Sequence, residues 1–438
     1  MLRMSLPVRR KAHKGLGSKI AMAMALAGGT VAGAGIATPA FAQDYSKAFV
    51  KTYKPVADIV NAEGGDVASQ KPNIPAVIAA IETEDDRFAA GQLILSMGSK
   101  LTDPSLQRQG LELMLASGKT PAEQVGQFQF YVGNFAYQAG DYAAAREALN
   151  AAAAAGYTDN DPEALIIESY FAEDQNKAGL DYLKQAVTAR MDAGREVPDN
   201  WLLRGLKVAY ENDMAAEATD IAALLAENNP TEQNWTNGLQ VVRALNDFEG
   251  QEMLDVMRLM RATGSMTTQR DYIEYVEAAD ARRMANEVLA VLQEGEAAGL
   301  VPADEPFFND AKSTAQERAA SDREGASELL ADAQSADTGV TALGAADLFM
   351  SFDDYANAEK MYALAVEKGG VDKNRALTRE GIAQAMQGES DAARATLQQV
   401  TGNRAPIAEM WIAYVDANDA PAAPAPAATP ATAAQPEG

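Results

Sequence analysis

The sequence contains one run that could hold a phosphate group, residues 117–120, with the letters Ser-Gly-Lys-Thr. A phosphate-binding loop needs a second glycine five residues before Gly118, and that position is Leu113. The loop also needs a strand before it, whereas Thr120 is followed by Pro121, a pairing typical of a helix start. We therefore interpret Thr120 as a helix cap and predict no nucleotide site.

Two acid-rich runs could attract a metal ion. Residues 159–163 (Asp-Asn-Asp-Pro-Glu) lack the central glycine and the distal bidentate glutamate of a calcium loop, so we interpret them as a turn between helices. Residues 82–86 carry four acids and are typical of an exposed helix start, where carboxylates favour the helix dipole. We predict neither a metal ion nor a cofactor.

Few residues of two types that commonly act in catalysis, cysteine and histidine, are present. The chain has no cysteine and a single histidine, His13, which removes disulfides, thiolate metal sites and cysteine nucleophiles from consideration. Its 62 acidic and 37 basic residues give a formal net charge of −25. A chain of this charge repels phosphate backbones and anionic lipid surfaces, so we predict no nucleic-acid partner.

The N-terminus has the composition of a secretory signal peptide. Six basic residues without an acid precede an apolar stretch, residues 20–38, and the small residues Ala40 and Ala42 follow at cleavage spacing. Cleavage after Ala42 leaves 31 bases and 62 acids, a net charge of −31. We predict a soluble periplasmic or secreted protein without membrane insertion after cleavage. An uncleaved anchor is the alternative, and Arg9-Arg10 leaves Sec or twin-arginine export open.

The rest of the sequence predicts helices. It is rich in Ala, Leu, Glu and Met, with apolar residues at helical spacing and little alternation of β-branched residues. Capping side chains precede proline at Asp103, Asp161 and Asn229, which indicates helix starts there. A chain of 438 residues exceeds one compact core, and a helix pair cannot bury its apolar face alone. We therefore predict an all-α fold of stacked helix pairs. Residues 85–97 and 104–117 form one pair, and 284–300 and 310–334 are further pairs.

A pattern of small and aromatic residues recurs along the chain. The clearest unit begins at Gly126, with Gly133 and Ala145 on either side of a Gly-Asp-Tyr turn over 140–142. Small residues there allow two antiparallel helices to approach closely. Other units keep parts of the pattern: Tyr170, Gly179, Leu183 and Ala186; Trp201, Tyr210, Ala218, Pro230 and Trp235; Asp354, Tyr355, Ala358, Tyr362 and Ala365; Gly381, Gly388, Ala393, Leu397 and Val400. The pattern resembles the tetratricopeptide repeat, although Gln129 replaces the usual tryptophan.

The resemblance implies an α-solenoid of stacked antiparallel helix pairs. The Ala/Pro composition of the end of the chain predicts a disordered tail. The resulting division of the sequence is a signal peptide over 1–42, degenerate repeats over 43–125, repeats over 126–259, degenerate helical pairs over 260–338, repeats with a capping helix (406–417) over 339–419, and the tail over 420–438.

The resemblance also implies a function, that of a protein-interaction scaffold with a groove lined by the first helix of each pair. The family's groove positions fall on six residues of this sequence: Asn134, Tyr137, Glu168, Phe171, Lys207 and Tyr210. These groups suit a protein or peptide ligand, although the aromatic ones could instead pack between repeats. The acidic chain favours a partner with basic patches, and the oligomeric state stays open.

A second hypothesis gives Glu168 a catalytic role. Residues 164–169 (Ala-Leu-Ile-Ile-Glu-Ser) look like the Glu-Ser segment of lytic transglycosylases, in which the glutamate acts as general acid and base on the glycan. The Gly-Leu-Met-Gln stretch that follows in that family is absent here. We therefore predict a non-enzymatic scaffold serving a cell-envelope process, and keep a peptidoglycan-acting enzyme as the alternative. A purely structural envelope component is a third hypothesis.

Overall fold

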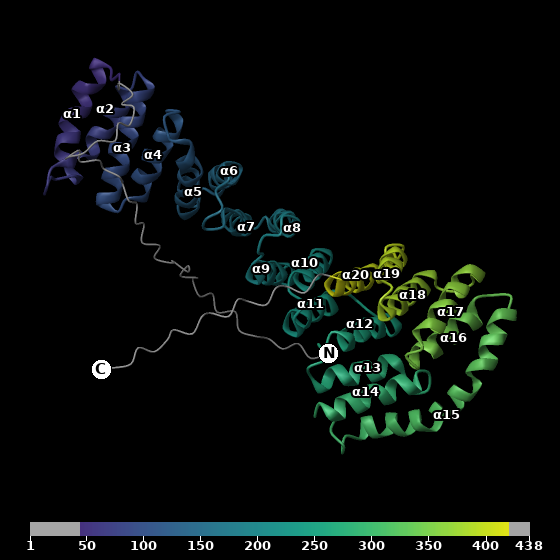
Figure 1. Ribbon diagram of the computed structural model, residues 1–438. Coiled ribbons are helices and arrows are strands. Elements are labelled where there is room, and N and C mark those ends of the chain that lie inside the picture. Colours follow the sequence, from purple (N-terminus) through teal and green to yellow (C-terminus); the bar gives the residue numbers. More distant parts are fainter. Residues whose placement is uncertain (1–43, 420–438) are drawn as a thin grey trace, which may run out of the picture. The chain divides into compact units, whose positions relative to one another are not determined.

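Helices make up the regular structure of the protein. The computed structural model describes residues 44–419, so the predicted signal peptide and the predicted disordered tail lie outside the described residues. Between residues 44 and 419 there are 20 α-helices, two 3-10 helices and no strand (Figure 1). The all-α prediction is confirmed. In the same range no helix is both long enough and apolar enough to cross a membrane.

The first helices form a closely packed group: α1 (Lys47–Asn61), a 3-10 helix (Ala68–Asn73), α2 (Ile74–Ala79), α3 (Glu84–Leu101) and α4 (Pro104–Ala116). The predicted pairing of 85–97 with 104–117 is confirmed as the contact of α3 with α4. A Cβ on Gly110 would lie 2.5 Å from the backbone nitrogen of Leu95, so only glycine allows this approach. Asp103 caps α4 as predicted, because its carboxylate accepts from the Leu106 amide at 3.2 Å.

The next helices are α5 (Ala122–Gln138), α6 (Tyr142–Ala154), α7 (Pro162–Ala172), α8 (Asn176–Asp192), α9 (Asp199–Glu211) and α10 (Ala215–Asn228). Each packs against its neighbour in the chain. Where α5 meets α6, a Cβ on Gly133 would lie 2.6 Å from Leu149 Cγ, and Ala145 is fully buried. The small residues of the repeat pattern are therefore required by this contact.

Helix α7 begins at Pro162 as predicted, but none of the side chains of Thr120, Asp161 and Asn229 caps the helix that follows it. Thr120 donates its hydroxyl to a carbonyl of α4 at 2.9 Å, so it does not cap α5. Asp161 precedes α7 in a left-handed conformation and makes no cap, because its carboxylate accepts from Arg190 instead. The helix expected after Asn229 begins later, and Thr231 caps it. In each case the side chain bonds elsewhere: Thr120 donates to a carbonyl of the preceding helix, Asp161 accepts from Arg190, and Asn229 donates to Asp199. Sequence spacing does not reveal these partners.

The remaining helices are α11 (Glu232–Leu245), α12 (Gln251–Ala262), α13 (Gln269–Ala279), α14 (Ala285–Ala297), α15 (Pro306–Ser335), α16 (Val340–Ser351), α17 (Tyr355–Lys368), α18 (Lys373–Gln387), α19 (Ser390–Leu397), a 3-10 helix (Gly402–Arg404) and α20 (Ala405–Asp419). The segments 284–300 and 310–334 each contribute one helix, α14 and α15, and these two helices pack together.

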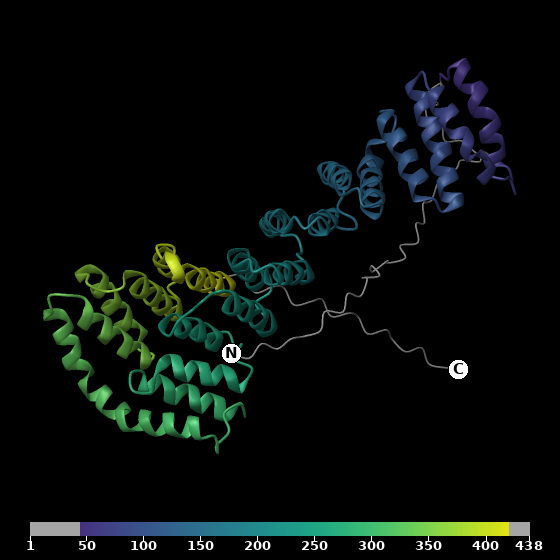
Figure 2. The ribbon, with the colours of Figure 1, turned by 180° about the vertical axis from the view of Figure 1, so that it is seen from behind.

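The last helix returns to the middle of the chain. Helix α20, predicted as a terminal cap, packs against α10 and also contacts α12 and α18 (Figure 1, Figure 2). Trp411 of α20 is 1% exposed, and its indole nitrogen donates to the Asp255 carbonyl at 3.1 Å. The C-terminal half, defined here as residues 215–419, is therefore closed by contacts between its first and last helices.

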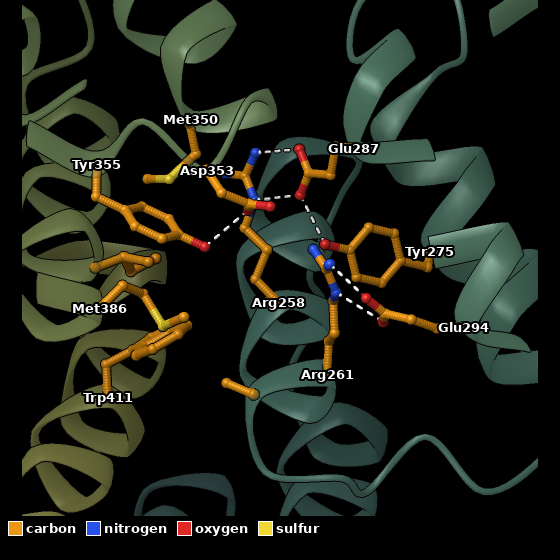
Figure 3. A pocket seen from close by; sticks show the side chains of 12 residues that line it. Arg258, Arg261, Tyr275, Glu287, Glu294, Met350, Asp353, Tyr355, Met386 and Trp411 are labelled. Carbon is orange, nitrogen blue, oxygen red and sulfur yellow. Dashed lines mark hydrogen bonds and ion pairs between the residues drawn. The ribbon is translucent and has the colours of Figure 1, made fainter. Parts of the chain in front are cut away.

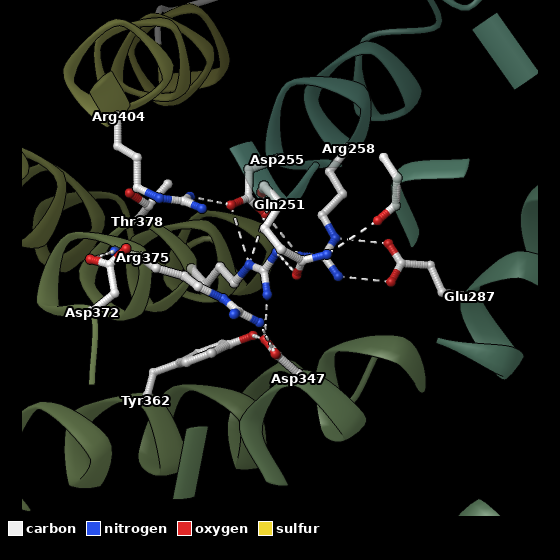
Figure 4. Close-up of polar contacts among 12 residues, drawn as sticks. Gln251, Asp255, Arg258, Glu287, Asp347, Tyr362, Asp372, Arg375, Thr378 and Arg404 are labelled. Atoms are coloured by element: carbon white, nitrogen blue, oxygen red, sulfur yellow. Dashed lines mark hydrogen bonds and ion pairs between the residues drawn. The ribbon is translucent and has the colours of Figure 1, made fainter. Parts of the chain in front are cut away.

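A network of buried charges lies where these helices meet (Figure 4). At its centre is Asp255 of α12, whose side chain has no solvent exposure. Its carboxylate accepts from Arg258 at 3.0 Å, from Arg379 of α18 at 2.9 Å and from Arg404 at 2.6 Å. Burial alone would raise the pKa of Asp255, but the three guanidinium groups hold it below its ordinary value.

Two further carboxylates extend the network. Asp347 of α16 accepts from Arg379 at 2.5 Å and from the Tyr362 hydroxyl at 2.8 Å, and it also pairs with Arg375. Glu287 of α14 receives two bonds from Arg258, both at 2.7 Å. Charged pairs thus tie five elements together, and the Nε groups of Arg375 and Arg404 are buried without a hydrogen-bond partner among residues 44–419.

Candidate functional site

The six predicted groove residues lie on three helices that each begin a predicted repeat. Asn134 and Tyr137 lie on α5, Glu168 and Phe171 on α7, and Lys207 and Tyr210 on α9. Their exposure differs: Phe171 is buried, Asn134, Tyr137 and Glu168 are half-buried, and Lys207 and Tyr210 are exposed.

Glu168 of α7 is held by an arginine of α9. Arg204 of α9 donates from Nε to one carboxylate oxygen of Glu168 at 2.9 Å and from Nη2 to the other at 3.3 Å. The same guanidinium lies 5.2 Å from the centre of the Phe171 ring. Arg204 therefore joins α7 to α9 through a two-point charged contact above an aromatic face.

Tyr137 belongs to the same neighbourhood. Burial, and then the negative charge of Glu168, raise the pKa of its phenol, while Arg204 acts in the opposite direction. Its ring also contacts Tyr142 at the start of α6, with ring centres 5.4 Å apart. The phenol is therefore neutral across the physiological range and available as a hydrogen-bond donor beside a carboxylate.

A pocket of about 320 Å³ lies between α7 and α9. Its lining combines apolar and polar groups: Ala164, Ile167, Glu168, Asn200, Trp201 and Arg204. The Trp201 ring is 8% exposed and is covered on one side by Arg190, whose guanidinium lies 4.2 Å from the ring centre. An aromatic and aliphatic wall with an amide, a carboxylate and a guanidinium beside it can hold a side chain and hydrogen-bond a peptide backbone.

The structure brings together only some of the predicted residues. Glu168 lines the pocket, Phe171 supports Arg204 from below, and Tyr137 interacts electrostatically with both charged groups. Lys207 and Tyr210 do not line it, and Lys207 pairs with Glu211 at 3.8 Å on the helix surface.

Sequence reasoning gave no groove role to Asn200, Trp201 or Arg204, although all three line the pocket. Arg204 follows Glu168 by 36 residues, close to one repeat, so its opposite charge was a signal for a contact between successive first helices. Trp201 entered the repeat pattern through its spacing from Trp235, without a role in the groove. Both lie on the face of α9 that meets α7.

Comparison with known proteins does not identify the chain further. No protein-family model matches it, and no curated protein matches it.

Proposed function

We propose that the protein is a tetratricopeptide-like scaffold whose α-solenoid stacks helix pairs, and that it binds an extended segment of another protein across α5, α7 and α9. The observation that carries this proposal is the pocket between α7 and α9, in which Trp201 and Ile167 lie beside the Glu168–Arg204 pair. The pocket combines an apolar wall with directional polar groups, which is the chemistry that anchors a side chain and fixes a backbone.

The chemistry at Glu168 supports binding over glycan cleavage. A general acid needs a carboxyl oxygen free to deliver a proton to the glycan, whereas both carboxylate oxygens of Glu168 accept from Arg204. In a binding groove the same pair presents fixed acceptors and donors to a ligand. We therefore propose a non-enzymatic adaptor of a cell-envelope process.

The acidic chain sets the class of partner. A net charge of −25 for the whole chain favours proteins with basic patches and accelerates their association at low salt. We also propose export with cleavage after Ala42, which N-terminal sequencing of the mature protein tests directly. A mature protein that begins at Met1 would contradict export.

The binding proposal is tested by site-specific crosslinking. A photoreactive residue at Asn200, on the pocket, captures the partner in the native envelope, whereas the same residue at Gln185, exposed on α8, does not. The crosslinked segment of the partner is then made as a synthetic peptide. We expect it to bind the purified protein, with at least tenfold weaker binding to the Tyr137→Ala and Arg204→Ala variants and weaker binding at high salt.

The enzyme hypothesis predicts a different result. Purified protein would digest peptidoglycan, and Glu168→Gln would abolish digestion without affecting the crosslinks at Asn200. That outcome, or equal crosslinking from Asn200 and Gln185, would overturn the scaffold proposal.

A further inference from the structure

The C-terminal half contains a cavity of its own, of about 360 Å³ (Figure 3). Its lining comes from α12, α13, α14, α16, α17, α18 and α20 and from the turn between α16 and α17. The volume lies in the range of small-molecule sites. Residues far apart in the sequence, from Arg258 of α12 to Trp411 of α20, meet around it.

The wall of the cavity has an apolar side. Met350, Ile382, Met386 and Trp411 line it, together with Ala262. Methionine side chains adapt to the shape of a ligand, and both sulfur and aromatic rings are polarisable surfaces. This side suits a compact apolar or aromatic group.

The polar side of the wall holds two arginines, each already matched by a glutamate. Arg258 gives Glu287 two bonds of 2.7 Å, and Arg261 gives Glu294 bonds of 2.9 and 2.6 Å. The Tyr275 hydroxyl donates to Glu287 as well, at 2.6 Å. An anionic ligand would have to displace a carboxylate from one of these two-point contacts, which disfavours anions here.

A third carboxylate lines the cavity and makes no direct ion pair among the described residues. Asp353, in the turn between α16 and α17, forms no ion pair with any residue in the range 44–419, and it is exposed. Its carboxylate accepts the Tyr355 hydroxyl at 2.8 Å. Burial lowers the pKa of the Arg261 guanidinium, and the negative charges of Glu294 and Asp353 act in the opposite direction and raise it. The lining therefore carries three carboxylates and two guanidinium groups.

We propose that this cavity binds a small organic cation, an amine carried on a short apolar or aromatic body. The ammonium group lies beside the Tyr355 ring and pairs with the exposed carboxylate of Asp353. The apolar body packs against Met350, Met386 and Trp411. A neutral ligand of the same shape would cover Asp353 without compensating its charge, which costs binding free energy.

The proposal is tested with three probes of the same shape: benzylamine, benzyl alcohol and benzoate. Binding is measured by calorimetry and by methyl spectra of protein with ¹³C-methyl methionine, in which Met350→Leu and Met386→Leu assign two signals among the 17 methionines. We expect benzylamine to bind, with shifts at the Met350 and Met386 methyl groups. Benzyl alcohol and benzoate should bind at least tenfold more weakly.

Two variants locate the effect. Asp353→Asn preserves the fold, because asparagine also tolerates the positive φ of 59° at this position, and it should weaken benzylamine at least tenfold. Asp332→Asn, at an exposed position of α15, is the matched control and should leave binding unchanged. Ala262→Phe places a ring in the cavity and should abolish binding while the helical content is retained.

Three outcomes would overturn the proposal. The first is equal binding of benzoate and benzylamine, which would show no preference for a cation. The second is binding that persists in Ala262→Phe, which would place the ligand elsewhere. The third is the absence of binding by any of the three probes up to their solubility limit.

Discussion

The α5–α9 region and the C-terminal half are both helical, but different forces hold them together. Between α5 and α9 small and aliphatic residues such as Gly133, Ala145 and Leu149 make many of the helix contacts, and Arg190 is the one buried charged residue. In the C-terminal half, Asp255 and Arg379 are completely buried at the meeting point of several helices. The difference shows that one chain can combine contacts between helices adjacent in the sequence with contacts between distant helices, such as that of Asp255 with Arg379, 124 residues apart.

The largest effect is expected from removing the centre of the buried network. Asp255→Ala leaves Arg258, Arg379 and Arg404 without their shared carboxylate and should destabilise the C-terminal half by about 3–5 kcal/mol. Hydrogen exchange measured by mass spectrometry should show lost protection in residues 215–419 and unchanged protection in α5 and α6. Asp332→Ala is the exposed control. An equal loss of hydrogen-exchange protection in residues 215–419 and in α5 and α6 would contradict the conclusion that different forces hold the two regions together.

A smaller effect is expected at the contact between α5 and α6. Ala145→Trp overpacks a fully buried position and should destabilise this pair by about 1–3 kcal/mol. Ala153→Trp, exposed on the same helix α6, should have little effect. The measurement is again local hydrogen exchange, now with the loss confined to the α5–α9 region. Unchanged protection of α5 and α6 would show that the contact tolerates a large ring.

The pH dependence of the C-terminal half should differ from that of the α5–α9 region. Burial raises the pKa of Glu409 on α20 to about 8, with Asp220 of α10 adding to the shift and Lys184 opposing it. Burial also raises the pKa of Glu227 on α10 to about 7, with Asp416 of α20 adding to it. Both values exceed the 4.5 of an ordinary glutamate, so their stabilising contribution is complete below pH 4.5 and is lost as pH rises through 7 to 8.

Denaturant unfolding at pH 5 and pH 9 tests this dependence. The protein should lose stability over this interval, and Glu409→Gln should recover about 1 kcal/mol at pH 9 after allowance for partial exposure. Glu147→Gln, exposed on α6, is the control and should not change the pH dependence. A protein more stable at pH 9 than at pH 5 would contradict the assignment.

The smallest effect on stability is expected at the proposed binding surface. Glu168 and Arg204 are each more than a third exposed, so Glu168→Gln should change the free energy of unfolding by less than about 1 kcal/mol. The same variant should weaken binding of the partner peptide. A stability loss as large as that of Asp255→Ala would place the pair in the structural framework instead.

Part of the candidate groove could be predicted from the sequence because its residues recur at repeat spacing. Glu168 and Phe171 were selected in this way, and they lie beside the pocket. Arg204 was missed because the position predicted for Glu168 gives no information on the charge that faces it from another helix. The buried network had a weaker signal: Asp255 and Arg258, three residues apart, interrupt the apolar residues of α12.

The sequence by itself determined the helices, the small residues at their crossings, the cap at Asp103 and the acidic character of the chain. These features depend on neighbours within about one repeat, where composition and spacing are directly visible. Only the tertiary structure decided that α20 packs on α10 and that Asp255 meets Arg379 and Arg404, partners separated by 124 and 149 residues. Such contacts leave no periodic pattern in the sequence. They depend on the angles at which many successive helices pack, since these angles together decide which distant surfaces meet.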